Sequence, residues 1–373
     1  MPTSPTTRRR FLRSGAHAAA AFALGPAFFA GCAKKTDTSG SPSAALRISN
    51  WPFYMAGGFI ADFRTKTGIA VDYREDFDDD ESWFAKVKDP LSRKQDIGCD
   101  LVVPTSFLAG RLHALGWLND LTAAKIPNLK NMRPDLRNDS ADPGRKFSAP
   151  YMSGLVGLAY NKAAIGRDIT AMEDVWDPAF KGKVSLFSDA LDGLGMIMLS
   201  QGHSPQNPTT EAVRQAVELV SEQKTKGQIR RFTGNDYTND LAVGNIVVGQ
   251  AYSGDVVQLQ VDNPDLQFVV PRTGGTTFVD TMVIPYTTQH QDWAEAWIDY
   301  VYDRGNYAKL IAHTYYVPVL SNMSDELAKI NPELASNPLI NPPQSVLDNV
   351  KSWPTLSDQQ TKEINDLYAA VIS

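Results

Sequence analysis

Three aspartates, Asp189, Asp192 and Asp280, are the candidate functional carboxylates of the sequence. Asp189 and Asp192 are three residues apart at the start of a helix expected over 190–200, and this spacing places both on one helix face. The positive end of the helix dipole favours their ionised form. Asp280 precedes the apolar run over 281–284, where an unpaired acid is costly. A purely structural role stays open, because Asp189 is also placed as a helix cap, with Asp192 completing a capping-box-like pair.

The rest of the chain carries few signals of catalysis or metal binding. It has no H-E-x-x-H, C-x-x-C or G-x-S-x-G motif, and its five histidines are scattered without ligand spacing. Gly193-Leu194-Gly195 lacks the third glycine of a dinucleotide-binding loop. We therefore expect no enzyme, no cofactor and no metal site.

An acidic run precedes a helix that is expected around Trp83 and Phe84. Its members are Glu75, Asp76, Asp78, Asp79, Asp80 and Glu81. The run lacks the turn glycine and the closing glutamate of an EF-hand loop. We interpret it as a solvated loop that caps the helix, with acids at the favourable end of the helix dipole.

Length and composition limit the class of protein. The chain has 373 residues, 43% hydrophobic and 21% charged, which is ordinary globular composition. At about 150 residues per domain, two domains are expected. The net charge of −6 disfavours nucleic acid, because phosphate binding needs a surplus of Lys and Arg. Two cysteines allow at most one disulfide, and the context of Cys99 indicates a buried strand start rather than a nucleophile.

The first 45 residues have the features of an export address. The basic run over 8–13 resembles a twin-arginine signal, and the apolar stretch over 18–29 is shorter than the roughly 20 residues that span a bilayer. Phe29-Ala30-Gly31-Cys32 resembles a lipobox, which predicts removal of residues 1–31 and lipidation of Cys32; an ordinary signal peptide is the alternative. That removal deletes four arginines and no acid, so the net charge becomes −10. Residues 32–45 are expected to be a flexible tether.

Strand and helix signals alternate from Leu46 onward. Strands are expected over residues 46–49, 69–73 and 101–103. Apolar residues at helical spacing predict a helix after each strand, and Gly68 and Gly116 are placed as helix stops. This β-α-β-α-β-α order predicts a parallel sheet with helices on both faces.

A second α/β block follows in the sequence. Strands are expected over 184–187, 246–252 and 266–270, and helices over 190–200, 210–225, 292–302, 307–313 and 359–372. The helix over 210–225 is expected to be longer and amphipathic, with five Ala and Val side chains on one face.

Six segments, in this order along the chain, carry a resemblance to a known family. They are 50–54 (Asn-Trp-Pro-Phe-Tyr), 100–107, 187–192, 250–255, 274–280 and Tyr316. Together they resemble the substrate-binding proteins of bacterial spermidine/putrescine ABC importers, over nearly all of the chain from Leu46. The sequence departs from the family at Tyr252 and Phe278, where the family has tryptophans, and at Pro52 and Phe53, where it has polar residues.

The resemblance implies an α/β fold of the type II periplasmic-binding-protein class, with two lobes and a ligand cleft between them. Lobe one is expected at 46–152 plus 281–320, and lobe two at 153–280 plus 321–373. The implied function is an exported, lipid-anchored solute-binding protein. It is expected to be a monomer at the outer face of the cytoplasmic membrane that captures a polyamine for an ABC permease.

The resemblance also implies a set of ligand-binding residues. They are Trp51, Tyr54, Thr105, Phe107, Asp189, Asp192, Tyr252, Phe278, Asp280 and Tyr316. A polyamine is a flexible apolar stem with two or more ammonium groups, so its site needs separated carboxylates and flat apolar walls. Ring faces attract ammonium groups by about 0.5–2 kcal/mol each and cover methylenes at about 0.8 kcal/mol per CH₂. Taken alone, Trp51, Phe278 and Tyr316 fit a structural role equally well.

Two other functions stay open at the level of sequence. A ferric-ion receptor of similar architecture is suggested by the adjacent Tyr315 and Tyr316, since phenolates ligate Fe³⁺. Such a site does not need three acids and several rings. An exported enzyme is the other alternative, and no motif speaks for it.

Overall fold

The computed structural model of the chain describes residues 45–77, 79–139 and 142–373. The described residues belong to one compact unit, and every element named below lies in it. The predicted export signal, the lipobox with Cys32 and the tether up to residue 44 lie outside the described residues. Ala45, which the sequence analysis places in the tether, is instead the first residue of strand β1.

The described residues contain one mixed β-sheet of ten strands. The strands are β1 (Ala45–Asn50), β2 (Ala70–Glu75), β3 (Leu101–Val102), β4 (Ser148–Asn161), β5 (Val184–Phe187), β6 (Ile229–Thr233), β7 (Val248–Tyr252), β8 (Leu266–Val269), β9 (Gly275–Val283) and β10 (Val350–Lys351). Their order is β2-β1-β3-β9-β4-β7-β5-β6, with β10 paired to β9 and β8 paired to β4.

Helices connect and cover these strands. They are α1 (Phe59–Thr67), α2 (Asp80–Ser92), α3 (Ser106–Ala114), α4 (Lys162–Ile165), α5 (Ala190–Ser200), α6 (Thr210–Thr225), α7 (Tyr237–Ala242), α8 (Ser253–Asp262), α9 (Gln291–Val301), α10 (Arg304–Thr314), α11 (Ser324–Ile330), α12 (Pro332–Ser336), α13 (Gln344–Asp348) and α14 (Asp358–Ile372). The 3₁₀ turns are η1 (Ala123–Lys125), η2 (Pro127–Asn131), η3 (Pro134–Leu136), η4 (Met172–Trp176) and η5 (Pro178–Phe180). None of the described helices is long and apolar enough to cross a bilayer.

Local sequence explains where the helices that carry the site begin. Thr105, Asp189 and Thr209 each accept a hydrogen bond from a backbone N–H in the first turn of α3, α5 and α6, respectively. Such caps satisfy donors that the helix itself leaves free. The predicted bounds of α5 and α6 agree with the structure, because both helices combine a polar cap with a periodic apolar face.

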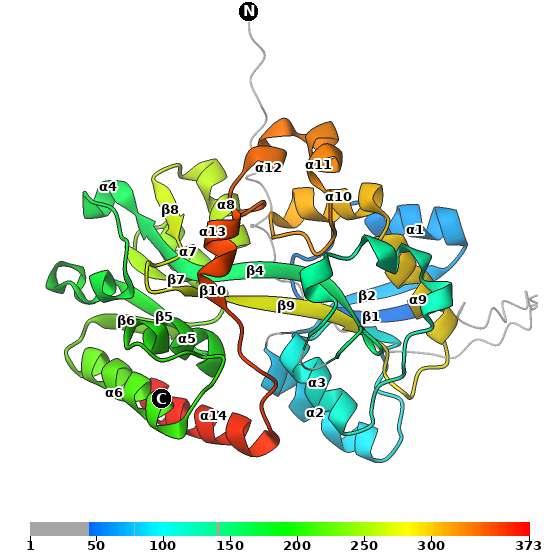
Figure 1. Ribbon diagram of the computed structural model, residues 1–373, viewed down its shortest axis with the longest axis horizontal. Helices are drawn as coiled ribbons and strands as arrows, with labels where there is room; N and C mark the ends of the chain where they lie inside the picture. Colours follow the sequence, from blue (N-terminus) through cyan, green and yellow to red (C-terminus); the bar gives the residue numbers. More distant parts are fainter. Residues whose placement is uncertain (1–44, 78, 140–141) are drawn as a thin grey trace, which may run out of the picture. The chain divides into compact units, whose positions relative to one another are not determined.

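Two parallel groups of strands are joined by an antiparallel pair. β1 pairs in parallel with β2 and β3, and β5 pairs in parallel with β6 and β7. Between these groups, β4 and β9 pair with each other and with their neighbours β7 and β3 in the antiparallel sense. In Figure 1, β4 and β9 run side by side through the centre and connect the two groups. The predicted parallel sheet therefore exists within each group but not between them.

The predicted lobe boundaries fall inside this central pair. Met152 pairs with Asp280, and Ser153 pairs with Val279, so the boundaries at 152/153 and 280/281 meet at neighbouring positions of one ladder. The C-terminal segment does not stay together as predicted, however. α11 packs on α10, which the sequence analysis assigns to lobe one, whereas α14 packs on α5 and α6.

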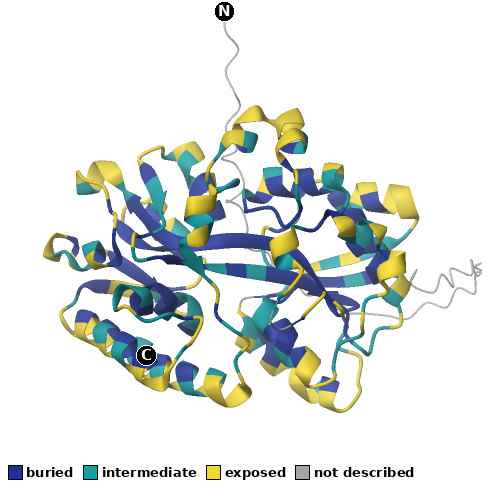
Figure 2. Cartoon of the chain, viewed as in Figure 1, coloured by how far each residue is buried: buried dark blue, intermediate teal, exposed yellow. Residues whose placement is uncertain are grey.

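Burial is concentrated along the central strands. Every residue of β4 except its last is buried (Figure 2), because helices and neighbouring strands enclose it. Cys99 is a free and buried cysteine, and burial raises the pKa of its thiol to about 11. This agrees with the predicted structural role, since the thiolate is the reactive form.

Candidate ligand-binding site

Asp280 is a buried carboxylate in the middle of β9. The residue is only 3% exposed, and its Oδ2 accepts a hydrogen bond of 2.7 Å from the hydroxyl of Tyr54. Burial raises the pKa of Asp280 well above its ordinary value, and the nearby charges of Asp80 and Asp192 raise it further. The charged form is therefore costly unless a cation compensates it.

Phe278 lies on the same face of β9 as Asp280, because side chains two residues apart share one face of a strand. Its partner residue on β4 is Gly154. A Cβ atom at Gly154 would come within 2.5 Å of the Phe278 ring, so glycine is what leaves room for this ring. The pair places an apolar ring beside a buried acid.

Four of the predicted rings form a continuous aromatic row, defined as Tyr252, Phe278, Tyr316 and Tyr54. Successive ring centroids lie 5.4, 5.7 and 5.7 Å apart, and each pair meets edge to face. These residues come from β7, β9, the segment after α10 and the segment after β1, respectively. The fold therefore brings together four rings that are distant in the sequence.

Asp192 and Asp189 lie at the Tyr252 end of the row. The hydroxyl of Tyr252 donates a 2.6 Å hydrogen bond to Oδ2 of Asp192. Asp189 is the N-cap of α5 and accepts hydrogen bonds from the backbone N–H groups of Leu191 and Asp192, which confirms the cap left open in the sequence analysis. Asp192 does not complete a capping box with it. The Asp189 side chain reaches solvent, yet the surrounding protein raises the pKa of Asp189. Burial also raises the pKa of Asp192, and the charge of Asp189 raises the Asp192 pKa further.

Asp255 is an acid of this site that the sequence analysis quoted within a segment but did not select. It lies in the first turn of α8. The hydroxyls of Tyr316 and Tyr237 donate 2.8 Å hydrogen bonds to its Oδ1 and Oδ2, respectively. Burial raises its pKa, and these two hydrogen bonds oppose that rise. Both Asp255 and Tyr237 lie within segments of ordinary helix-start sequence, which gave no signal of their own.

Asp80 is a second acid of this site that was not selected from the sequence. The interpretation of its acidic run as a solvated loop is wrong for this residue. Asp79 does cap α2, as expected, by accepting a hydrogen bond from the Ser82 N–H. Asp80 is not part of a solvated loop: it accepts hydrogen bonds from both the hydroxyl and the N–H of Thr105. Burial raises the pKa of Asp80 to about 7.

These five acids form the carboxylate cluster: Asp80, Asp189, Asp192, Asp255 and Asp280. Within the part of the chain that the structure describes, no Lys, Arg or His side chain is among the groups that shift the pKa values of these five acids. Asp100 provides a contrast, because this buried acid pairs with Arg47 at 2.8 Å. Asp280 is buried, Asp80, Asp192 and Asp255 are half-buried, and Asp189 is exposed. For the buried and half-buried members, the lack of a protein cation costs free energy unless a cation is bound.

Trp51 and Phe107 do not join the aromatic row. Trp51 packs on Phe77, with ring centroids 4.9 Å apart, and Phe77 stacks in turn on Trp83. Phe107 lies in the first turn of α3 and is partly buried against the core. Trp51 is close in sequence to Tyr54, and Phe107 is close to Thr105. The ring contacts that define the aromatic row do not include Trp51 or Phe107.

Of the two adjacent tyrosines that suggest an iron receptor, Tyr316 is engaged with an acid. The Tyr316 hydroxyl donates its hydrogen bond to Asp255, and burial raises the Tyr316 pKa well above its ordinary value. Over residues 45–77, 79–139 and 142–373, no three His, Cys, Asp or Glu side chains are grouped so that they could hold a metal ion.

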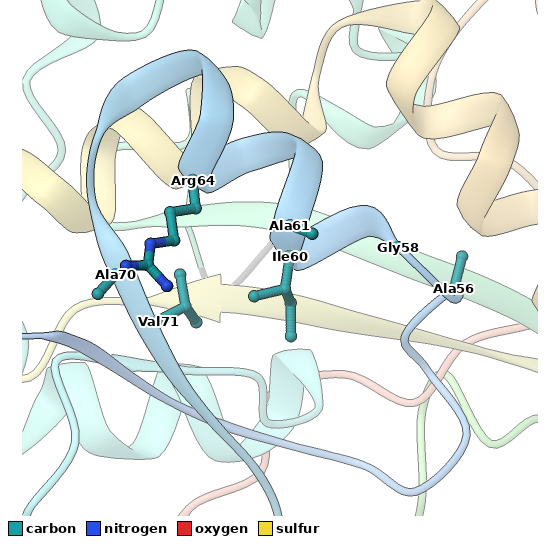
Figure 3. A pocket seen from close by; sticks show the side chains of 7 residues that line it. All are labelled: Ala56, Gly58, Ile60, Ala61, Arg64, Ala70 and Val71. Atoms are coloured by element: carbon teal, nitrogen blue, oxygen red, sulfur yellow. The ribbon is translucent and has the colours of Figure 1, made fainter.

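A surface hollow elsewhere on the unit is distinct from the predicted site. It has a volume of about 410 Å³ and lies between α1 and β2. Figure 3 shows Arg64 and the apolar side chains of Ile60 and Val71 lining it. None of the predicted ligand residues and none of the cluster acids lines this hollow.

Substitution of Gly254 tests whether the aromatic row is held rigidly. A Cβ atom at this position would lie 2.7 Å from the Tyr316 ring, which contacts Phe278 and Tyr54 and is tied to Asp255. We expect Gly254→Ala to lower the melting temperature, because overpacking costs about 1–3 kcal/mol, although alanine is the better helix former. Gly234→Ala is the control, since its Cβ meets nothing within 4 Å. Equal melting temperatures for the two variants would contradict a rigid row.

The fold and the site together define a class of protein. Two parallel α/β groups joined by antiparallel strands form the type II periplasmic-binding-protein fold, in which the ligand cleft lies between two lobes. The family model described as bacterial extracellular solute-binding protein matches residues 58–342. The chain belongs to this family, whose members are solute-binding proteins and not enzymes.

Individual relatives agree with this assignment. The chain is 28% identical over 319 residues to spermidine/putrescine-binding periplasmic protein 1 of Haemophilus influenzae, covering 84% of this chain and 86% of the relative. Among solved structures, it is similar to a putative spermidine/putrescine ABC transporter protein of Listeria monocytogenes, with a TM-score of 0.79, 24% identity and coverage of 88% and 98%. It is also similar to the spermidine/putrescine substrate-binding protein PotD of Streptococcus pneumoniae, with a TM-score of 0.75, 25% identity and the same coverage. The family assignment supports an exported protein.

Proposed function

We propose that the chain binds polyamines such as spermidine and putrescine at the carboxylate cluster and the aromatic row, and delivers them to an ABC importer. The observation that carries this proposal is the convergence of enclosed acids for which the described residues supply no cation. The Haemophilus and Streptococcus relatives, both known as spermidine/putrescine-binding proteins, support the same class of ligand.

The chemistry of a polyamine matches this arrangement group by group. Its ammonium groups would replace the missing counter-cations beside Asp192, Asp255 and Asp280. Its methylene stem would lie against the aromatic row, where ring faces stabilise ammonium by about 0.5–2 kcal/mol and buried methylenes contribute about 0.8 kcal/mol each. The ten predicted residues are part of this proposal, with Thr105 acting through its hydrogen bond to Asp80, and Asp80, Asp255 and Tyr237 are added to them. Trp51 and Phe107 would act at the margin, since they lie outside the row.

The same charge pattern selects against other small metabolites. A ligand with a carboxylate would bring a further negative charge into a cluster that already holds five acids, and like charges at close range cost free energy. The ligand class is therefore amines without acidic groups. A comparison of putrescine with 4-aminobutanoate isolates this effect, because the two molecules share one stem and differ in a single end group.

Thermal-shift measurements test the proposal with such matched compounds. The protein without residues 1–32 is expected to gain melting temperature with spermidine and putrescine, since a ligand that binds the folded state stabilises it. It is expected to gain none with 4-aminobutanoate, glutamate or ferric citrate. Stabilisation by 4-aminobutanoate equal to that by putrescine would contradict the proposed selectivity, and stabilisation by ferric citrate alone would favour the iron receptor.

We further propose that ligand closure is a hinge motion of two lobes, with the boundaries at 152/153 and 280/281 in the central strand pair. A ligand held from both sides would favour the closed form by its differential contacts. The mature protein would act as a monomer.

We also propose twin-arginine export followed by lipidation of Cys32, which would anchor the protein outside the cytoplasmic membrane. A modified cysteine that carries at least two acyl chains would make the protein sediment with membranes. Cys32→Ser is expected to move it from the membrane fraction to the supernatant after cell fractionation, without altering ligand affinity. Equal membrane fractions for the wild type and Cys32→Ser would contradict lipidation at this residue.

A further inference from the structure

Three consecutive acids at the start of α2 have three different environments. Asp79 is used by the helix itself, as the cap that accepts from the Ser82 N–H at 2.7 Å. Glu81 is neutralised by Arg111, whose Nη1 lies 3.0 Å from Oε1. Asp80 alone has neither a donor from its own helix nor a cationic partner among the described residues, and its hydrogen bonds go to Thr105 of another element.

Thr105 fixes the position of the Asp80 carboxylate relative to Asp280. The backbone of Thr105 forms an antiparallel bridge with Asp280, and the N–H of Thr281 donates a 2.8 Å hydrogen bond to the Pro104 carbonyl. The Thr105 hydroxyl also accepts from the Leu108 N–H as the cap of α3. Thr105 therefore contacts both acids. Its backbone pairs with that of Asp280, and its N–H and hydroxyl donate to the Asp80 carboxylate.

The turn that carries Asp80 is itself tied down. Arg111 of α3 holds Glu81, lies 3.8 Å from the centroid of the Phe84 ring, and places its Nε 2.8 Å from Asp358 at the start of α14. Helix α14 packs on α5, which bears Asp189 and Asp192. The beginning of α2 and the beginning of α5 are thus linked through one arginine outside the cluster, and the charge of Asp189 acts on Asp80.

We propose that Asp80, positioned by Thr105, is a specificity-determining residue that holds an additional ammonium group between α2 and α5, and so makes the receptor favour triamines over diamines. This inference rests on the proposed polyamine function. At one end of the aromatic row, Asp255 accepts a hydrogen bond from Tyr316 and Asp280 accepts one from Tyr54. At the other end, Asp192 accepts one from Tyr252. Asp80 adds a carboxylate from the α2 side, close enough to Asp189 for the two charges to interact, and a third ammonium group would pair with it.

Calorimetric titration of three proteins, the wild type and two variants, with spermidine and putrescine tests this proposal. For Asp80→Asn, we expect spermidine affinity to fall at least about tenfold and putrescine affinity to change less than about threefold. Asp89→Asn, which removes an exposed acid of the same helix that pairs with Arg93, is the control and is expected to keep the wild-type ratio of the two affinities. Equal losses for both ligands, or no loss for spermidine, would overturn the specificity role of Asp80.

Thr105 provides a second test, because its proposed role is positioning rather than contact. Thr105→Val removes the hydroxyl that donates to Asp80 and should lower the preference for spermidine, whereas Thr105→Ser keeps the hydroxyl and should restore it. A merely structural role would make both ligands weaken together. If the wild-type protein binds neither amine, the proposed function itself fails; if it binds both and Asp80→Asn leaves their ratio unchanged, only the present inference fails.

Discussion

Replacement of Asp280 by Asn is expected to weaken spermidine binding by about 30-fold or more. Asp280 is the most deeply buried member of the carboxylate cluster, and removal of one partner of a buried charge pair costs roughly 2–5 kcal/mol. Asparagine has nearly the same shape and can still accept the hydrogen bond from the Tyr54 hydroxyl. The loss should therefore reflect the missing charge, and calorimetric titration at pH 7.5 measures it.

The same variant separates binding from folding. Because an enclosed, unpaired carboxylate disfavours the empty folded state, Asp280→Asn should melt at the same temperature as the wild type without ligand, or higher, and should lose the stabilisation that spermidine provides. Asp366→Asn, which changes an exposed acid paired with Lys362, should leave both quantities unchanged. Wild-type spermidine affinity in Asp280→Asn would contradict the role of this acid.

Spermidine affinity is expected to fall as the pH is lowered from 7.5 to 5.5. In the empty protein, burial raises the pKa of Asp80 to about 7 and that of Asp280 well above its ordinary value. Burial also raises the pKa of Asp192, with Asp189 adding to the effect. A bound ammonium group favours the ionised carboxylates, so binding releases protons. Each released proton makes affinity about tenfold weaker per pH unit below the relevant pKa.

The stability of the empty protein should show the opposite trend. An acid whose pKa is higher in the folded than in the unfolded state stabilises folding most below its unfolded pKa, and this contribution is lost as the pH rises through the folded pKa. For Asp80 the window runs from about 4 to about 7. Titrations in buffers of different ionisation enthalpy count the released protons, while aliphatic amines, with pKa values near 10, stay charged throughout. Spermidine affinity independent of pH, with no proton release, would contradict this account.

Much of the fold could be predicted because many of its helices and short strands are locally encoded. Helix α6 has an apolar face and the cap Thr209, strand β1 alternates apolar and polar residues, and strand β5 is a short, mostly apolar run. Strand β4 was missed, although it is the longest strand described. Its buried pattern is almost continuous, so no alternation marks it, and Gly154 and Gly157 reduce its strand character. Its identity depends on pairing with β7, β8 and β9.

The candidate site was predictable to the extent that one element or the family resemblance encodes it. Phe278 and Asp280 share a face of β9 by strand geometry, and Asp189 and Asp192 share the start of α5. The partners Tyr54–Asp280, Tyr252–Asp192 and Tyr316–Asp255 are 226, 60 and 61 residues apart, and no local pattern specifies them. Asp80 was misread because its sequence context is that of an ordinary helix cap, and only the approach of Thr105 distinguishes it from Asp79.

Direct calorimetric titration of the protein without residues 1–32, at pH 7.5, with spermidine, putrescine and 4-aminobutanoate tests the central claim. Enclosed acids that lack a protein cation should bind both amines with dissociation constants in the micromolar range or below, corresponding to about −8 kcal/mol or more. They should show no heat of binding with the carboxylate-bearing analogue. Absence of binding by both amines at millimolar concentration would contradict the claim that this cluster exists to receive a polycation.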